Sequence, residues 1–334
     1  MHESKGSPHN ISSHDYRPSF GPSTDIPSIL LAIAIVLLNT TVLHLVRARV
    51  TLRTVTNIFL ASLATSDLLT GLYVIPAYLA CKATANNGIC QASVPLLTFT
   101  SFSTVTHISL VTAERHVAIM FALRHTVLVT KFRAKLVIVS VWVVSLILSL
   151  IQLAWTPPGD LDVTEEGTEN FRKSEIAFSL FNFVTVLIQF PFLAYSYYKI
   201  FSEVRRHNEM IKKDQSHGCI TPGNQHSHES RTVIMFVLML VTYTFCWMPN
   251  ALIRYQYSST AFHLPEWAEH VIIHLRFVTS LVNPCFCLFW KRDFREAFSH
   301  GRRMRSDEFQ VVDSPHLCST RLTAGHYIEL QVVP

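Results

Sequence analysis

The chain has 334 residues, of which 49% are hydrophobic and only 15% are charged, and its mean hydropathy is +0.29. A soluble domain of this length carries more charge, so the composition excludes an ordinary globular protein and favours a membrane protein. The formal net charge of +5 does not indicate nucleic-acid binding, because the Lys and Arg residues fall in short clusters between apolar segments. The seven cysteines form no CxxC pair, which argues against a disulfide scaffold or a zinc ribbon.

Seven segments are apolar and long enough to cross a bilayer, which takes about 20 residues of helix. The third segment is rich in Ser and Thr, whose hydroxyls bond back to their own helix or across to neighbouring helices. We therefore expect an all-α membrane protein, a seven-helix bundle over residues 27–290, with the third helix at its centre. The seven segments cover residues 27–46, 56–80, 92–119, 134–155, 175–201, 232–257 and 268–289.

The distribution of basic residues predicts which loops face the cytoplasm. The loops after the first, third and fifth spans carry Arg and Lys, as does the segment after the seventh, whereas the loop after the fourth span is mostly acidic. Residues 1–26 are therefore expected outside the cell and residues 301–334 in the cytoplasm. Asn10 begins a glycosylation sequon on the outer segment.

Residues 291–300 predict a short amphipathic helix lying on the membrane. Trp290, Phe294 and Ala297 recur at helical spacing, while basic residues take the other face. Beyond this helix, Cys318 is a candidate for a palmitoyl anchor in the cytoplasmic tail.

Polar residues inside the spans are the most informative, because each must be satisfied by a partner, by water or by an ion. Pro249 and Pro284 each remove an intrahelical hydrogen bond and are expected to kink their helices. The intramembrane polar residues are Asn39 in span one, Asp67 in span two, Thr104 in span three, Trp247 in span six, and Ser280 and Asn283 in span seven.

Two charged residues, Glu114 and Arg115, stand at the end of the third span. Counting 25 residues of helix from Cys90, at the outer end, gives a rise of about 37 Å and carries Arg115 to the cytoplasmic rim. Glu229 lies 20 residues before Pro249, about 30 Å back along the sixth span, at the same rim. These charges either pair across the bundle or extend singly into interfacial water.

In order and spacing these residues resemble the rhodopsin-like (class A) family of G-protein-coupled receptors over about residues 28–300. The resemblance implies a plasma-membrane receptor, not an enzyme, that needs no cofactor and activates a heterotrimeric G protein through outward movement of span six. The motifs that carry it are Asn39, LATSDLL around Asp67, Cys90 with Glu114-Arg115, Trp142, FCWMP at Phe245–Pro249, and Asn283-Pro284.

The resemblance also implies three groups of functional residues. An ionic lock pairs Arg115 with Glu114 and, across the bundle, with Glu229. A sodium pocket comprises Asn39, Asp67, Thr104, Ser280 and Asn283. An activation switch comprises Phe245, Trp247, Pro249, Asn283, Pro284 and Cys287. The residues themselves leave other interpretations open, namely a carboxyl of Asp67 that is protonated or bonded to helix neighbours, and static kinks at the two prolines.

The sequence departs from the family pattern at several positions. Residues 156–175 contain no Cys, so Cys90 is either free or bridged locally to Cys81. Cys287 occupies the place of a tyrosine, and a thiol cannot supply the same phenolic hydrogen bond. His116 follows Arg115 where the family has a tyrosine.

The ligand is expected to enter from outside, among spans three, five, six and seven. Leu97 stands where amine receptors carry an Asp, and no Lys lies between Trp267 and Lys291 where opsins carry one. The absence of a cysteine from the loop between the fourth and fifth spans resembles melanocortin receptors and lysolipid or cannabinoid receptors. Asn250, just after FCWMP, resembles several ligand classes of receptor, adenosine receptors among them. Arg254 and Arg276 either meet an anionic ligand or are neutralised by the acidic loop. The candidate ligand-binding residues are Leu97, Asn250, Arg254, His274, Arg276 and Phe277.

The expected partners are a heterotrimeric G protein, arrestin, membrane lipids, and an extracellular small-molecule, lipid or peptide ligand, with no nucleic acid. A multispan transporter is the alternative, but the two halves of the chain show none of the self-similarity that transporter repeats produce. A membrane-embedded hydrolase is disfavoured because His107 and His274 stand in no HExxH motif. The His and Cys residues of the loop after the fifth span match no standard metal site, so no bound metal is expected.

Overall fold

The computed structural model describes residues 21–155, 165–216, 234–235, 238–239, 241–250, 253 and 264–297. The regular elements among these residues are all helices, which confirms the predicted all-α class. Four residues with predicted roles, Asn10, Glu229, Arg254 and Cys318, lie outside the described part of the chain.

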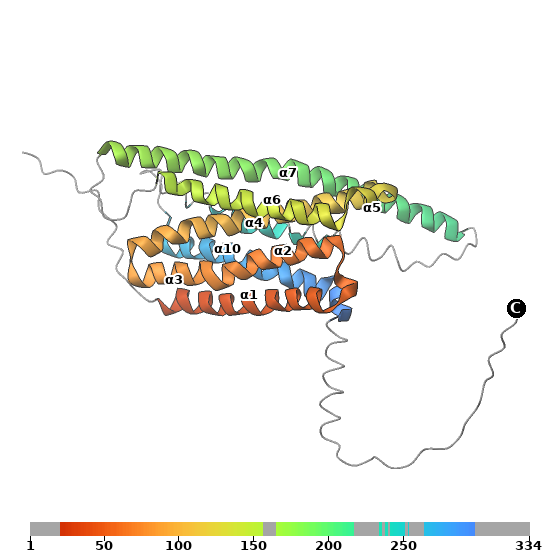
Figure 1. The fold of residues 1–334 in the computed structure, drawn as a ribbon, viewed down its shortest axis with the longest axis horizontal. Coiled ribbons are helices and arrows are strands. Elements are labelled where there is room, and N and C mark those ends of the chain that lie inside the picture. Colours follow the sequence, from red (N-terminus) through yellow and green to blue (C-terminus); the bar gives the residue numbers. More distant parts are fainter. Residues whose placement is uncertain are drawn as a thin grey trace, which may run out of the picture.

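The helices run side by side along one axis, with α1 and α7 on opposite sides of the bundle and α2, α4 and α10 between them (Figure 1). Five helical stretches in the described residues are long and apolar enough to cross a membrane: Pro22–Ala48, Val55–Thr84, Asn87–Met120, Lys131–Ala154 and Glu266–Trp290. The elements are α1 (Pro22–Ala48), η1 (Val50–Leu52), α2 (Val55–Leu69), η2 (Thr70–Val74), α3 (Ile75–Thr84), α4 (Asn87–Met120), η3 (Ala122–Arg124), α5 (His125–Leu128), α6 (Lys131–Leu150), η4 (Ile151–Ala154), α7 (Glu165–Ser216), α10 (Glu266–Cys285) and η5 (Phe286–Trp290).

Prolines interrupt two of the predicted spans. The second span continues from α2 to α3 through a π-helical turn, η2, which ends at Val74, two residues before Pro76. The last span changes from α10 to the π-helical η5 at Phe286, two residues after Pro284. Each proline has no N–H for the regular hydrogen-bond ladder, and each lies within two residues of a π-turn.

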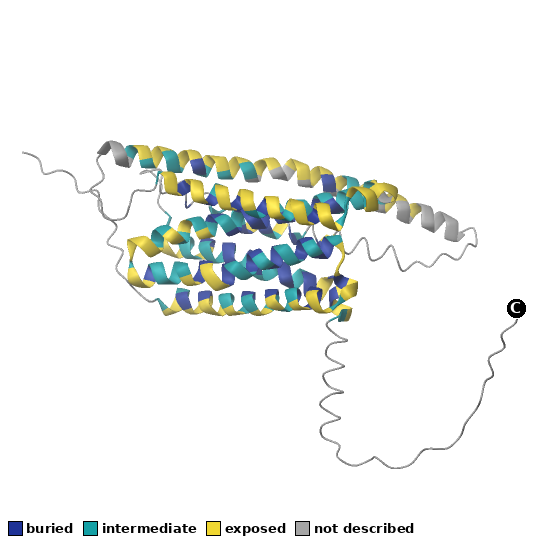
Figure 2. Cartoon of the chain, in the orientation of Figure 1, coloured by how far each residue is buried: buried dark blue, intermediate teal, exposed yellow. Residues whose placement is uncertain are grey.

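The helix α4 is the centre of the bundle, as its Ser and Thr content predicted. It contacts α2, α3, α6 and α7. Its residues Phe102–Val105, His107 and Ile108 are all buried, and buried residues gather in the interior of the bundle (Figure 2). Its hydroxyls bond back to the carbonyl oxygens four residues earlier, as Thr106 does to Phe102 at 2.7 Å and Thr112 to Ile108 at 2.9 Å. Such internal bonding lets polar side chains sit in an apolar environment.

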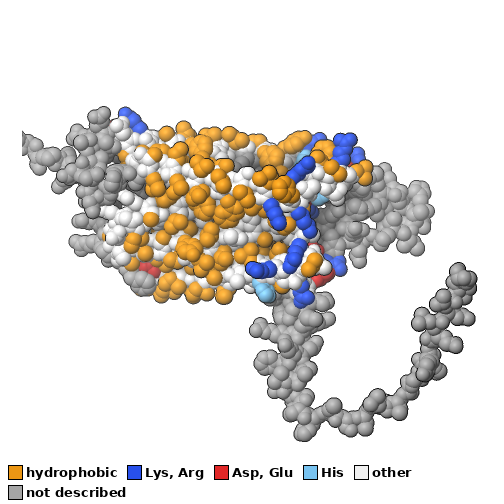
Figure 3. All heavy atoms as spheres, in the orientation of Figure 1, with side chains coloured by type: hydrophobic (Ala, Val, Ile, Leu, Met, Phe, Trp, Pro, Cys, Tyr) orange, Lys and Arg blue, Asp and Glu red, His pale blue; other side chains and the backbone are white. Residues whose placement is uncertain are grey.

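The outer surface of the bundle carries a broad apolar belt (Figure 3). Many of its large side chains are exposed, among them Leu30, Leu37, Val139 and Ile188. Most Lys and Arg side chains on this face gather at the end of the bundle where α5 lies. This combination fits a belt facing lipid and a basic rim facing one aqueous side.

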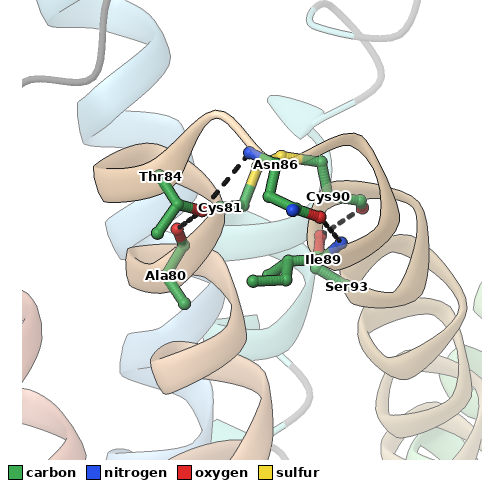
Figure 4. The surroundings of a disulfide bond; sticks show 7 residues. All are labelled: Ala80, Cys81, Thr84, Asn86, Ile89, Cys90 and Ser93. Atoms are coloured by element: carbon green, nitrogen blue, oxygen red, sulfur yellow. Dashed lines mark hydrogen bonds between the residues drawn. A yellow bond between two sulfur atoms is a disulfide. The ribbon is translucent and has the colours of Figure 1, made fainter. Parts of the chain in front are cut away.

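A disulfide joins Cys81 at the end of α3 to Cys90 at the start of α4 (Figure 4). Between them, Ala85 takes the left-handed conformation that ends α3, with φ of 48°. The side chain of Asn86 then caps α4 by accepting a hydrogen bond from the backbone N–H of Ile89 at 3.1 Å. Of the two alternatives for Cys90, the structure shows the local bridge.

Gly71, in η2, lies in close contact with α1. A Cβ built on this residue would lie 2.9 Å from Val36 Cγ2 and 3.1 Å from the backbone oxygen of Ala32, both in α1. A larger residue at this position would therefore force η2 and α1 apart, because one of these two neighbours is backbone and cannot rotate away.

The substitution Gly71→Ala is expected to destabilise the bundle by about 1–3 kcal/mol, the usual cost of overpacking. The measurement is the melting temperature of the purified protein in detergent, which should fall by several degrees. Gly88→Ala is the control, since its Cβ would meet only the side-chain Oδ1 of Asn86, at 3.3 Å. A Gly71→Ala variant as stable as this control would contradict the steric argument.

Candidate functional site

A buried charge cluster surrounds Glu114 near the end of α4. Its carboxylate accepts hydrogen bonds from Arg115 at 2.6 and 2.7 Å and from the hydroxyl of Thr56 at 3.0 Å. His125 Nε2 lies 3.1 Å from the same carboxylate, and Arg115 also donates to Thr56. Glu114 is buried, whereas the Arg115 side chain is 25% exposed. The cluster thus holds the acid fixed and leaves part of the guanidinium accessible.

A second polar cluster lies inside the bundle around Asp67. Asn283 Nδ2 donates to Asp67 Oδ2 at 3.0 Å, and Asn39 Nδ2 donates to the backbone oxygen of Ser280 at 3.1 Å. All four residues are buried. The buried oxygens Asp67 Oδ1 and Asn39 Oδ1 meet no hydrogen-bond donor among the described residues. Such oxygens have the chemistry to hold a hard cation.

Thr104, the fifth residue of the predicted sodium pocket, is buried on α4. It lines a small cavity of about 230 Å³ together with Ser280, Trp247 and Arg276. The residues grouped from sequence therefore come together in space from α1, α2, α4 and α10.

The predicted switch residues of the sixth span do not all lie together in the structure. Trp247 stacks on Tyr243, with ring centroids 5.3 Å apart and planes at 18°. Phe245, also a predicted switch residue, is 71% exposed and takes no part in this stack. Residues two apart lie about 200° apart around a helix, whereas Tyr243, four residues before Trp247, shares its face.

Two further switch residues belong to the last span and its extension. Pro284 is buried in α10, next to Asn283. Cys287 is 3% exposed and packs in the main apolar core of the bundle. Its thiol therefore faces the interior at the position where the family has a tyrosine.

A cavity of about 640 Å³, part of it open to solvent, lies between α4, α7, residues 241–250 and α10. Two of the predicted ligand-binding residues, Asn250 and Arg276, line it. Of the twelve residues that line it, six are aromatic or aliphatic and six have polar side chains. The remaining lining residues are Thr98, Ser101, Phe102, Val105, Ser179, Asn182, Phe183, Tyr243, Trp247 and Met248.

The other ligand candidates lie elsewhere. Leu97 and Phe277 line the small cavity and belong to an apolar cluster with Ile35. His274 lines an outer groove that also includes Lys82. Its Nδ1 lies 2.6 Å from the carbonyl oxygen of His270 and its Nε2 lies 2.8 Å from Ser28 Oγ. Because His274 ties α10 to α1, it serves the packing of the bundle.

Sequence reasoning missed the polar partners that long-range packing brings to these sites. His107 in α4 bonds through Nε2 to Ser62 Oγ at 2.7 Å, and Trp142 Nε1 donates to the same hydroxyl at 2.9 Å. The resemblance marked Trp142, but nothing in the sequence paired it with His107. Such contacts depend on how α2, α4 and α6 pack against one another.

Lys291 departs from the prediction that the basic residues of the amphipathic helix take its polar face. It lies immediately before the helical segment 292–297, and its side chain turns inward, is 7% exposed and donates to Asn57 Oδ1. Burial lowers the pKa of Lys291 to about 8. Phe294 in the same segment is completely buried, as the predicted amphipathic pattern requires.

Comparison with known proteins shows the family. The model of the 7 transmembrane receptor (rhodopsin family) matches residues 38–286, more than half of the chain. The chain therefore belongs to the rhodopsin family of seven-transmembrane receptors. It is a multi-pass membrane receptor that couples to G proteins, and neither an enzyme nor a transporter.

Individual relatives agree with this assignment. The histamine H2 receptor of Homo sapiens is 27% identical over 284 residues, which cover 78% of this chain and 77% of that receptor. The histamine H2 receptor of Canis lupus familiaris is 26% identical over 266 residues, covering 76% and 72%. The adenosine receptor A2a of Homo sapiens is 26% identical over 341 residues, covering 92% and 79%.

The buried position of Lys291 predicts a pH-dependent stability. Between pH 8 and about 10.4, the usual lysine value, the unfolded chain binds more protons than the folded one, so the free energy of unfolding should rise. The free energy of unfolding should increase on the order of 1 kcal/mol. The measurement is the rise in melting temperature from pH 8 to pH 10, which should be larger for wild type than for Lys291→Met. The exposed Lys135 provides the control variant Lys135→Met, which should behave as wild type. An identical pH profile for wild type and Lys291→Met would contradict the prediction.

Proposed function

We propose that this receptor binds a small extracellular ligand in the cavity of about 640 Å³ and transmits binding to a G protein at the Arg115 end. The observation that carries the proposal is that one rigid helix, α4, serves both sites. Ser101 lines the cavity, and Arg115 follows 14 residues later, about 21 Å along the helix axis. A displacement of α4 or of a helix packed on it can therefore act at both ends.

The proposed orientation places the Arg115 end and residues 301–334 in the cytoplasm, with residues 1–26 outside the plasma membrane. The basic rim in Figure 3 supports it, because Lys and Arg collect on the cytoplasmic side of membrane proteins. Glycosylation at Asn10, palmitoylation at Cys318, and contacts with arrestin and membrane lipids are further expectations of the same orientation.

The proposed resting restraint is the ionic lock of Arg115 with Glu114, to which Glu229 adds a second acid from span six. Its support is that Glu114 is buried and bonded by Arg115 and Thr56. When the lock opens, the guanidinium turns toward the G protein and span six moves outward. A coupling of about 1–3 kcal/mol is enough to shift such a two-state equilibrium.

The proposed link between cavity and lock runs through the switch residues. Trp247 contributes to both the large and the small cavity, and its stack on Tyr243 leads toward the core. Pro249 and Pro284 supply the points where the last two spans bend. Cys287, in place of a tyrosine, offers a weaker hydrogen bond to the active arrangement and favours altered basal activity.

A sodium ion is the proposed allosteric ligand of the Asp67 pocket, held by Asp67, Asn39, Thr104, Ser280 and Asn283. Its support is the pair of buried oxygens on Asp67 and Asn39 that have no donor among the described residues. A bound cation would hold these helices together and favour the resting state.

The ligand itself is proposed to be a small molecule, because the cavity is enclosed on several sides by side chains of the bundle. The relatives named above are called histamine and adenosine receptors, and these two compounds are therefore the first probes to apply.

The test of coupling is a cell-based G-protein dissociation assay across the Gα classes, using a ligand library, on wild type, Arg115→Ala and Glu229→Ala. Arg115→Ala should abolish the signal, and Glu229→Ala should raise the basal signal because one acid of the lock is lost. Arg133→Ala, an exposed arginine of α6, is the control. A full signal from Arg115→Ala at normal surface expression would overturn the proposed role of this residue.

The sodium proposal is tested by the melting temperature of purified receptor in NaCl against choline chloride at equal ionic strength. Wild type should be more stable in sodium, and Asp67→Asn should lose most of that difference, because a neutral amide binds a hard cation weakly. Asn182→Ala, outside the pocket, should keep it. Equal sodium responses of wild type and Asp67→Asn would rule out this site.

A further inference from the structure

We infer that Lys291 is a substitute partner for Glu114: when Arg115 leaves that carboxylate to bind a G protein, the ammonium group of Lys291 takes its place. The inference rests on the proposed function and adds a positioning residue to the lock at the Arg115 end. One cation replaces another on a buried acid, so the charge of the acid is compensated in both states.

The carboxylate of Glu114 needs a cation whether the lock is closed or open, because its side chain is only 2% exposed. Arg115 supplies two charge-assisted hydrogen bonds, at 2.6 and 2.7 Å. If the guanidinium turns away, a buried charge without a cation strongly disfavours the open lock. Thr56 is a neutral donor, and His125, 3.1 Å away, is a cation only when its ring is protonated. A second cation nearby therefore makes the lock easier to open.

Lys291 lies beside the residues that hold Glu114. Its side chain is 7% exposed, and Nζ donates to Asn57 Oδ1. Asn57 directly follows Thr56 in α2, and the hydroxyl of Thr56 donates to the Glu114 carboxylate at 3.0 Å. Burial lowers the pKa of Lys291 to about 8, which leaves the ammonium mostly protonated at neutral pH.

The resting contacts of Lys291 leave it able to move. Asn57 is a neutral acceptor, and the Asp293 carboxylate, 4.0 Å from Nζ, belongs to a side chain that is 58% exposed, so water screens this pair. The ammonium also lies 5.6 Å from the centroid of the Phe294 ring. A buried carboxylate attracts a cation more strongly than these groups do, and the four-carbon stem of lysine is flexible.

Both members of the lock act on Lys291 electrostatically. Burial is the main cause of its lowered pKa, and among the smaller causes the charge of Arg115 lowers the pKa while that of Glu114 raises it. In the closed lock, the like charge of Arg115 opposes a closer approach of the ammonium. Departure of Arg115 removes this repulsion and leaves the attraction to Glu114. The same movement therefore exposes the carboxylate and draws Lys291 toward it.

The first experiment measures melting temperatures of the purified full-length protein in detergent at pH 7. Arg115→Met reproduces the loss of the guanidinium from the acid, and Lys291→Met and Lys291→Arg are each made with and without it. Glu114→Gln removes the charge of the acid. Arg292→Met is the matched control, because Arg292 is the next residue in the chain, is about half exposed and pairs with Glu296.

In the Arg115→Met background, Lys291→Met should lower the melting temperature by about 3 °C or more beyond its effect in wild type, because Glu114 then has neither cation. Lys291→Arg should avoid most of this loss, and Arg292→Met should have equal effects in both backgrounds. Adding Glu114→Gln should abolish the difference. Equal effects of Lys291→Met in both backgrounds, or a difference that survives Glu114→Gln, overturn the inference.

The second experiment leaves Arg115 in place and decides the question if Arg115→Met does not fold. It measures nucleotide exchange on purified heterotrimeric G proteins of each Gα class, with receptor in lipid vesicles and no added ligand. Lys291→Met should slow exchange by about 5-fold or more, because the open lock is disfavoured, and Lys291→Arg should restore it. Exchange by Lys291→Met at the wild-type rate contradicts the substitution of one cation for the other.

Failure of the proposed function gives a different result. If wild type promotes no exchange, or if Arg115→Ala exchanges as fast as wild type, the coupling mechanism fails, whereas the melting-temperature cycle still reports whether Lys291 compensates Glu114. Conversely, exchange that depends on Arg115 but is unchanged by Lys291→Met preserves the receptor mechanism and refutes the role of Lys291.

Discussion

The cost of an unsatisfied polar group in an apolar environment organises this molecule more than any other constraint. Inside a membrane, a hydroxyl, amide or charge must find its partner within the protein. The helix α4 meets this requirement in two ways: its hydroxyls bond to its own backbone, and its His107 and Glu114 bond to Ser62 and Thr56 of α2. These pairs fix which face of α4 turns toward α2, and the positions of both functional ends follow from that register.

Charged side chains are buried or partly buried at both ends of the molecule, and their bonding partners differ. At the Arg115 end, Glu114 and Arg115 neutralise each other, and Thr56 and His125 complete the hydrogen bonding. In the cavity, Arg276 donates hydrogen bonds to Asn250 and Ser101 and lies against the face of Trp247. The pair of Glu114 and Arg115 is suited to a contact that opens and closes within the protein.

Much of the fold and part of the site could be predicted from the sequence because a polar residue in an apolar span is conspicuous. Asn39, Asp67, Ser280 and Asn283 were grouped in advance, and the structure brings them together from three helices. Phe245 and Trp247 were both predicted as switch residues, but helical geometry turns Phe245 outward, and Tyr243 forms the stack with Trp247.

Other features could not be obtained from sequence because they depend on three-dimensional packing. Nothing in the sequence distinguishes Thr56 and His125. They become partners of Glu114 only because α2 and the segment after α4 pack next to it. The inward turn of Lys291 toward Asn57 likewise joins residues far apart in the chain. The local partner of Cys90 was one of two options, and spacing alone could not choose between a free thiol and a bridge.

The bridge between Cys81 and Cys90 has a consequence for how this receptor can diversify. Because the start of α4 is tied to α3 within a short turn, this covalent anchor does not involve the connection between α6 and α7. Residues 156–175, which include that connection, contain no Cys, so they cannot form a disulfide with α4. Its length and composition are free to change over evolution without shifting the register of the helix that bears Ser101 and Arg115.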